Sequence, residues 1–106
     1  MRMWMIPPWT LCRQHLLGEH RELHTLAGHL RKGRRLGRYA TDRLVNPAGM
    51  HRRHDALVGE MIARGYQHKS PLDLRGLELP VVEIDEDRNL QDLYARCERC
   101  RKRSKE

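Results

Sequence analysis

The stretch LCRQHLLGEHREL, residues 11–23, decides how this chain folds. Apolar residues recur in it, and in the residues that follow, at the spacing of one helix face, which predicts an amphipathic helix over residues 11–32. Thr10 is a suitable N-cap, and Gly33 follows the last periodic residue as a stop signal. Before the helix, Pro7 and Pro8 exclude helical backbone, so residues 1–9 are predicted to form an extended lead.

Two further helices fit the same apolar spacing, over residues 50–64 and residues 87–102. A short helix over residues 39–45 fits as well, and residues 72–85 are predicted to form a connecting loop. Runs of β-branched residues are scarce, and the only strand-like stretch, residues 79–84, contains a proline. The pattern therefore predicts an all-α, compact single domain over residues 1–106, with three main helices and an extended N-terminal lead.

The composition points to a polyanionic partner. Lys and Arg number 21 against 14 Asp and Glu, giving a net charge of +7 in 106 residues. Such a basic balance favours nucleic acid, although a solvated basic surface would have the same composition. No apolar stretch is long enough to cross a membrane, and the proline-broken start is too short for a signal peptide. We expect a monomer in a reducing cytoplasm, associated with the nucleoid.

The first predicted helix carries a polar stripe. His15, Glu22 and His29 are each seven residues apart, so they share one side, at the shoulder of the apolar face. A carboxylate between two histidines at the edge of a core is a candidate acid or base. Gly18, one turn before Glu22, leaves space for an approaching group. The alternative is that Glu22, like Glu19, is an ordinary surface charge.

The same residues do not predict a metal site or a cofactor. Seven-residue spacing places neighbouring members of the stripe two turns apart, too far for one ion. An odd total of three cysteines argues against a full disulfide framework. Cys97 and Cys100 form one CxxC, and zinc would also require Cys12 and a histidine such as His51 or His54. Unligated cysteines are the favoured interpretation, and a small zinc protein is the weaker one.

The pattern Gln-His-Leu…Glu-x-Arg-Glu-Leu in residues 14–23 resembles the phage-type pyrimidine-dimer DNA glycosylases, the endonuclease V family of thymine-dimer repair. The similarity continues through residues 26–32 and resumes at residues 61–66. The resemblance implies a helical fold with the N-terminus laid across the helices, acting on damaged double-stranded DNA. It also implies attack of an N-terminal α-amine on the sugar C1′, a Schiff base, and strand cleavage by β-elimination.

The resemblance implies a role for each matching residue. The amine belongs to Met1, which we expect to be retained because Arg2 is bulky, and Glu22 falls on the catalytic carboxylate. An α-amine has an unperturbed pKa of about 7.7–8.0, so a usable fraction is neutral near pH 7. The implied DNA contacts are Arg2, Gln14, His15 and Arg21.

Charge adds further phosphate contacts, and some features depart from the family pattern. Arg31, Lys32, Arg34 and Arg35 are suited to bind the backbone of DNA.

Thr25 replaces an arginine of the phage members, and their aromatic C-terminal segment has no counterpart here. Alternative functions are a lyase or glycosylase for another damaged base or abasic sites, and a non-catalytic basic helical DNA-binding module.

Overall fold

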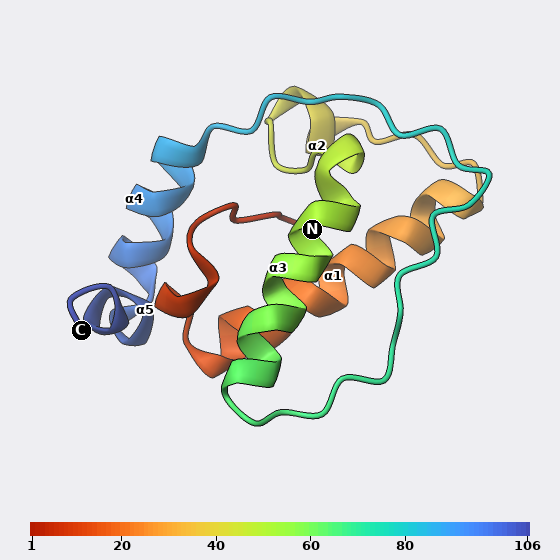
Figure 1. The fold of residues 1–106 in the computed structure, drawn as a ribbon. Helices are drawn as coiled ribbons and strands as arrows, with labels where there is room; N and C mark the ends of the chain where they lie inside the picture. The colour runs from red at the N-terminus through yellow and green to blue at the C-terminus, as the bar shows by residue number, and fades with distance from the viewer.

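Two crossing helices form the centre of the structure. The computed structural model describes all 106 residues, and in it α1 (Arg13–Arg31) packs behind α3 (Met50–Ala63) (Figure 1). Helices α4 (Glu86–Arg96) and α5 (Glu98–Arg103) lie along one side, and the short α2 (Arg38–Thr41) lies at another edge. Two 3-10 turns, η1 (Pro8–Thr10) and η2 (Pro47–Gly49), complete the elements. No strand forms, so the all-α prediction is confirmed.

The N-terminal lead is part of the core. The chain begins near the middle of the molecule, runs outward between α3 and α4, and turns through η1 into α1 (Figure 1). Met3, Trp4 and Ile6 are each at most 6% exposed. The Met3 N–H donates to the Leu44 carbonyl at 2.8 Å, which ties the lead to the segment after α2. The predicted extended lead is therefore confirmed, and it is buried between helices.

Helix ends differ from the sequence prediction in three places. The short helix predicted over 39–45 ends at Thr41, because the backbone of Arg43 is left-handed, with φ at 56°. Helix α1 begins at Arg13 with Cys12 as its N-cap, because Thr10 belongs to η1 and its hydroxyl donates to the Pro7 carbonyl. The last helix, predicted over 87–102, is broken at Cys97, whose backbone is extended at φ −127° and ψ 101°. The Cys97 sulfur caps α5 by accepting the Cys100 N–H, so the chain turns there and Cys100 becomes buried.

One cluster of buried side chains joins these elements. It contains 15 residues, contributed by the lead, α1, α3, the segment before η2, α4 and α5. Its members are Met3, Trp4, Ile6, Leu11, Cys12, Leu16, Leu23, Leu26, Ala27, Val45, Met50, Leu57, Met61, Leu93 and Cys100. The core is thin, as expected for a chain of this length, so polar contacts inside it affect stability strongly.

A buried ion pair lies inside this core. The Arg53 guanidinium binds both oxygens of the Glu19 carboxylate, with 2.9 Å between Nη2 and Oε1. The Arg53 side chain is 6% exposed and the Glu19 side chain is 0% exposed. Arg53 also donates to the Ile6 carbonyl at 2.8 Å, and the Trp4 backbone hydrogen-bonds Glu19. Burial raises the pKa of Glu19, and Arg53 opposes that rise. Glu19 is therefore not the surface charge that the sequence allowed, and the pair holds the lead between α1 and α3.

The connection from α3 to α4 has no regular structure and circles the molecule (Figure 1). Side-chain and backbone contacts hold it: Arg31 donates to the carbonyls of Asp73 and Arg75, and the Ala48 N–H donates to the Pro80 carbonyl. The predicted loop over 72–85 is confirmed, and residues 79–84 stay irregular. None of the helices combines the length and the apolar character that crossing a membrane would need.

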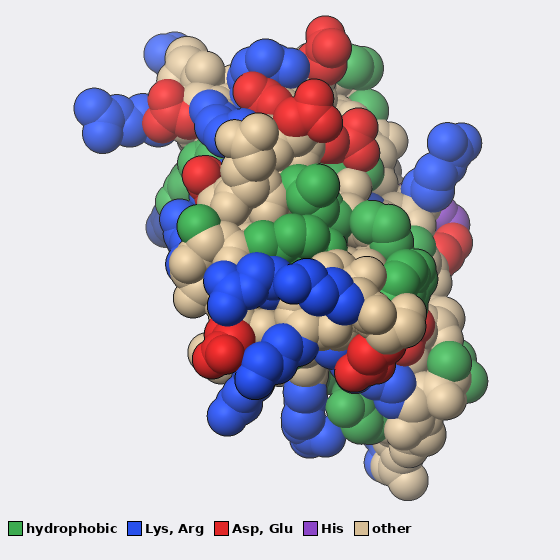
Figure 2. Space-filling view, turned by 90° about the vertical axis from the view of Figure 1, so that its left-hand side faces the viewer, with side chains coloured by type: hydrophobic (Ala, Val, Ile, Leu, Met, Phe, Trp, Pro, Cys, Tyr) green, Lys and Arg blue, Asp and Glu red, His purple; other side chains and the backbone are tan.

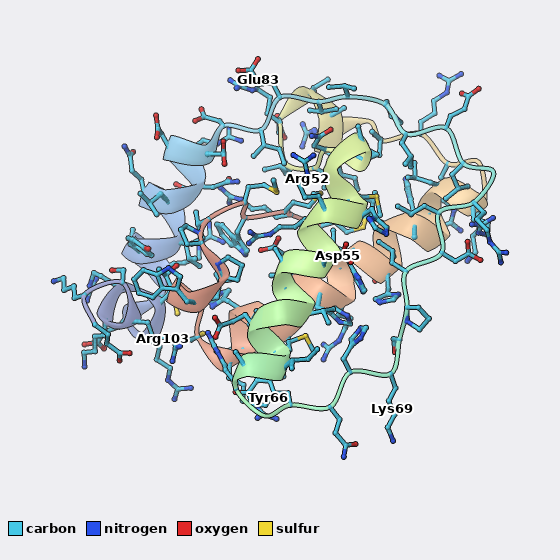
Figure 3. The ribbon with its side chains drawn as sticks, viewed as in Figure 1. Arg52, Asp55, Tyr66, Lys69, Glu83 and Arg103 are labelled. Atoms are coloured by element: carbon cyan, nitrogen blue, oxygen red, sulfur yellow. The ribbon has the colours of Figure 1, made fainter.

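We predict that Arg53→Ala lowers the free energy of unfolding by about 3–5 kcal/mol, because it leaves the Glu19 carboxylate buried without a partner. Urea denaturation measures this change. The control is Arg52→Ala on the same helix, where the side chain is exposed (Figure 3) and the loss should be within about 0.5 kcal/mol. The double variant Glu19→Gln, Arg53→Met removes both charges and should recover much of the free energy of unfolding that Arg53→Ala loses. Equal stability of all these variants would contradict the assignment of a buried ion pair.

Candidate active site

A pocket of about 400 Å³ opens where the lead meets α1 and α4. Four of the residues predicted for the site, Met1, Arg2, His15 and Glu22, line it together. The remaining lining residues are Trp4, Gly18, Glu19, Leu44 and Arg96. A pocket of this volume is within the range of small-molecule sites and is large enough for a nucleobase. Gly18 lines the wall without a side chain, and a Cβ at that position would meet nothing within 4 Å.

The Glu22 carboxylate lies against the start of the chain. Its Oε2 accepts the backbone N–H of Arg2 at 3.0 Å. This nitrogen belongs to the peptide bond that follows Met1, so the first residue is held beside the carboxylate. Glu22 is partly buried on the pocket wall, at the middle of α1. The structure therefore places Met1 and Glu22 at one pocket, with the carboxylate bound to the peptide N–H that follows Met1.

Arg2 is bound inside the protein. Its Nε and Nη2 donate to the Asn89 side-chain oxygen at 3.0 and 2.7 Å, and Nη2 also donates to Asp92 at 2.7 Å. The guanidinium carbon lies 4.2 Å from the centre of the Trp4 ring, where a cation is attracted by the aromatic face. Arg2 keeps the pKa of the Asp92 carboxyl below its usual value, so the pair stays charged. The side chain is 16% exposed and is engaged within the fold instead of being displayed to a phosphate.

Asn89 and Arg96 on α4 are site residues that the sequence did not reveal. Asn89 is fully buried, and its side-chain nitrogen donates to the carbonyls of Met3 and Trp4 at 3.0 Å each. Its oxygen accepts Arg2, so one amide fixes both the backbone and the first cationic side chain of the lead. Arg96 lines the pocket and lies 5.6 Å from the Trp4 ring centre. The sequence could not predict either residue as part of the site, because each has the pattern of an ordinary polar residue on a surface helix.

His15 lies between the pocket and the three cysteines. Its Nδ1 is 3.2 Å from the Cys12 sulfur and 3.6 Å from the Cys100 sulfur. Burial, assisted by the charge of Arg96, lowers the pKa of His15, which favours the neutral imidazole. The CxxC pair does meet Cys12, as a zinc site would require, but the histidine beside them is His15 and not His51 or His54. The ligand atoms of all four residues lie within 4.8 Å of one another.

The remaining predicted DNA contacts lie outside the pocket. Gln14 and Arg21 are exposed on α1, and His29 contacts the Arg35 carbonyl at the far end of that helix, so His29 does not join the stripe in one site. Arg31 holds the long loop. The three exposed cations Lys32, Arg34 and Arg35 make no ion pair.

A second basic surface lies over α5. Figure 2 shows that face, where Lys and Arg side chains form a band across the lower half and acidic side chains gather above. The exposed cations of α5 are Arg99, Arg101 and Lys102. The structure folds this basic stretch into a helix beside the lead, where Arg103 donates to the Trp9 carbonyl at 3.0 Å.

Four histidines form a separate group behind the pocket. His20 and His24 from α1, His54 from α3 and His68 from the loop place their ligand atoms within 4.8 Å of one another. The ring centres of His20 and His54 are 4.8 Å apart. Burial and the neighbouring histidines lower the pKa of His20 to about 4. Sequence reasoning missed this group, because His54 and His68 approach α1 only through the tertiary fold.

Comparison with known proteins bears on this arrangement. Residues 1–74 match a family described as pyrimidine dimer DNA glycosylase. The match covers the lead, α1, α2 and α3, and it ends before α5 and before α4, the helix that contributes Asn89 and Arg96. No curated protein and no solved structure matches the chain.

We predict that Asn89→Ala loosens the lead, because two backbone carbonyls and the Arg2 guanidinium lose their partner. The expected loss is about 1–3 kcal/mol in the free energy of unfolding. Hydrogen exchange at the backbone N–H groups of residues 2–6 should accelerate in the variant. Gln91→Ala, at an exposed position of the same helix, is the matched control and should change neither measurement. An unchanged exchange rate in Asn89→Ala would rule out this anchoring role.

Proposed function

The chain belongs to the pyrimidine dimer DNA glycosylase family, and from this premise we propose that it removes one base of a pyrimidine dimer from double-stranded DNA and then cleaves the strand as a lyase. The observation that supports this proposal best is the 3.0 Å hydrogen bond from the Arg2 N–H to Glu22. It keeps the start of the chain on a carboxylate at a pocket wide enough for a base. An amine that adds to a sugar needs a positioned acid or base nearby.

The first step is proposed to be nucleophilic displacement at the sugar. The neutral α-amine of Met1 attacks C1′, the glycosidic C–N bond breaks, and its electron pair leaves with the pyrimidine. The amine gives up a proton, the C1′–O4′ bond opens, and O4′ takes a proton, so that an iminium joins the protein to C1′. Glu22 faces the centre at which positive charge develops, and a carboxylate there stabilises that charge.

The second step uses the iminium as an electron sink. Loss of a proton from C2′ is followed by breakage of the C3′–O3′ bond, and the departing phosphate carries the electron pair. Glu22 accepts the backbone N–H of Arg2, the residue after Met1, and it is proposed to accept the C2′ proton. Water then hydrolyses the imine and returns the free amine.

Access to C1′ requires a displaced base. Damaged base pairs open at lower cost than intact ones, and the pocket between the lead and α1 is the proposed receptor for the displaced nucleotide. The exposed cations Lys32, Arg34 and Arg35, with Arg21 and Gln14 on α1, are proposed to contact the backbone. Arg2 is proposed to position Met1, since its guanidinium is already bound by Asn89 and Asp92. The enzyme is proposed to act as a monomer.

We predict covalent trapping by borohydride. The protein should form a stable adduct with abasic-site duplex and with ultraviolet-irradiated duplex, because reduction fixes the Schiff base. The adduct should be absent while a removable carrier protein blocks the amine and should appear once the carrier is cleaved off at Met1. Intact mass identifies the first residue. If the protein with a free amine forms no adduct on either duplex, it is a non-catalytic DNA-binding module. If it is trapped on abasic DNA alone, its substrate is an abasic site or a damaged base other than the pyrimidine dimer.

We predict that Glu22→Gln keeps DNA binding within a few-fold and lowers base excision roughly 10²–10⁴-fold, because the amide cannot exchange protons or balance the charge of the iminium. Single-turnover excision and filter binding separate the two effects. Glu78→Gln, at an exposed position of the loop, is the control. Full activity in Glu22→Gln would show that this residue has another role.

We predict opposite effects of Gly18→Leu on stability and activity. Leucine is the better helix former, so the free energy of unfolding should rise by about 0.5–1 kcal/mol. The new side chain would enter the pocket, where nothing opposes it, and excision should fall on the order of 100-fold. Gly28→Leu, on the same helix and equally open but outside the pocket, should gain stability without losing activity. Equal activity of both variants would exclude the pocket as the base receptor.

A further inference from the structure

Three cysteines and one histidine converge where α1 begins and α4 ends. The Cys12 sulfur lies 3.8 Å from the Cys97 sulfur and 3.2 Å from the His15 Nδ1, and the Cys100 sulfur lies 3.6 Å from that nitrogen. All four ligand atoms are within 4.8 Å of one another. Cys12 and Cys100 are 5% and 0% exposed. The group therefore has the composition of a Cys3His metal site, with two of its residues buried and His15 and Cys97 partly buried.

Three of the six separations between these atoms are close to those of a tetrahedral zinc site. Zinc bonds of about 2.3 Å to sulfur and about 2.0–2.1 Å to nitrogen place neighbouring sulfurs about 3.8 Å apart, and sulfur and nitrogen about 3.6 Å apart. The measured separations of 3.8, 3.6 and 3.2 Å agree with those edges within a few tenths of an ångström. A disulfide, by contrast, requires sulfurs about 2.05 Å apart, and all three cysteines are free.

Backbone donors surround the sulfurs, as they do around zinc-bound thiolates. The Cys12 N–H points at the Cys100 sulfur at 3.2 Å, and the Cys100 N–H points at the Cys97 sulfur at 3.4 Å. Such bonds stabilise negative charge on sulfur and orient the ligand. The break of the last helix at Cys97 supplies one of these bonds, because it makes Cys97 the N-cap of α5.

We propose that Cys12, His15, Cys97 and Cys100 bind one structural zinc ion that fastens α4 and α5 to the first turn of α1. The cluster would hold in place the C-terminal segment, which lies outside the family match, supplies Arg96 to the pocket and anchors the lead through Asn89. The site is closed by four protein ligands, so its role is structural and not catalytic. His15 is thereby a positioning residue of the pocket wall.

A different observation supports a second metal site at the four histidines. Nε2 of His24 and Nε2 of His54 are buried and have no hydrogen-bond partner. His20 and His68 face each other with 3.0 Å between their Nε2 atoms. No acidic side chain belongs to the group, which leaves four imidazoles directed at one another. Buried polar atoms without partners are rare, and a cation at their centre would satisfy all four nitrogens at once.

We propose that His20, His24, His54 and His68 bind a divalent transition-metal ion of the zinc, nickel and copper class, which imidazole ligands prefer. The ion would tie α1 to α3 and to the loop at His68, on the side of α1 away from the cysteines. Lys69 extends away from this loop (Figure 3), next to the proposed ligand. Neither metal site depends on the enzymatic activity proposed above.

The test measures the metal content of the full-length protein and of matched variants by mass spectrometry. The wild type should contain about two metal ions per chain, Cys97→Ser about one, and His54→Ala about one. His51→Ala, an exposed histidine on the helix of His54, is the control and should keep both. Zinc-edge X-ray absorption should report sulfur ligands in His54→Ala and only nitrogen ligands in Cys97→Ser.

A second measurement decides the outcome if a variant does not fold. Wild-type protein stripped with a chelator under reducing conditions is titrated with zinc while thiol reactivity and circular dichroism are recorded. The cysteines should become unreactive at the first equivalent, and helix content and melting temperature should recover. A stripped protein that keeps its fold and takes up no zinc would overturn both sites. If the protein takes up zinc but its thiols stay reactive, or if two cysteines form an internal disulfide, the cysteine site alone is overturned. If it binds a single equivalent of zinc through sulfur, the histidine site alone is overturned.

Discussion

The start of the chain must be held inside the protein, and the buried pair of Glu19 and Arg53 makes this possible. An extended segment without regular structure leaves its backbone polar groups unpaired, and burial makes each unpaired group costly. Arg53 and Asn89 satisfy carbonyls of the lead, and the Trp4 backbone binds Glu19. Each contact places charge or polarity in a thin core, where it is stabilising only while all partners are present. This arrangement favours one path for the lead over others.

The positions of Met1 and Glu22 follow from that path. The hydrogen bond from the Arg2 N–H to Glu22 is the last of a series of contacts that begins at Ile6 and runs back toward the start of the chain. Because several elements hold the segment, the first residue is positioned by the tertiary fold and not by its own contacts alone. In the proposed reaction, a nucleophile at a free chain end would lose much conformational freedom, and here this cost is met during folding instead.

Three regions of the molecule are built on different parts of helix α1. Its first turn presents Cys12 and His15 to the C-terminal helices, its middle presents Gly18 and Glu22 to the pocket, and His20 faces α3 and the loop. The family match covers this helix but ends before α4, so the segment that completes the pocket is joined to the matched part through contacts at the lead and at the cysteines. A helix is suited to this task because its rigid spacing fixes all three groups relative to one another.

The sequence alone determined the helices, the extended lead and the family, and its polar stripe singled out Glu22. These features are local: apolar spacing, paired prolines and one gapless motif carry them. Only the tertiary structure decided that Glu19 is buried, that His15 and not His51 joins the cysteines, and that Asn89 anchors the lead while Arg96 lines the pocket. These pairings join residues 34 to 88 positions apart, as in Glu19 with Arg53 and Cys12 with Cys100. Helical periodicity says which side of a helix is apolar, but it carries no information on which distant polar group will meet that side.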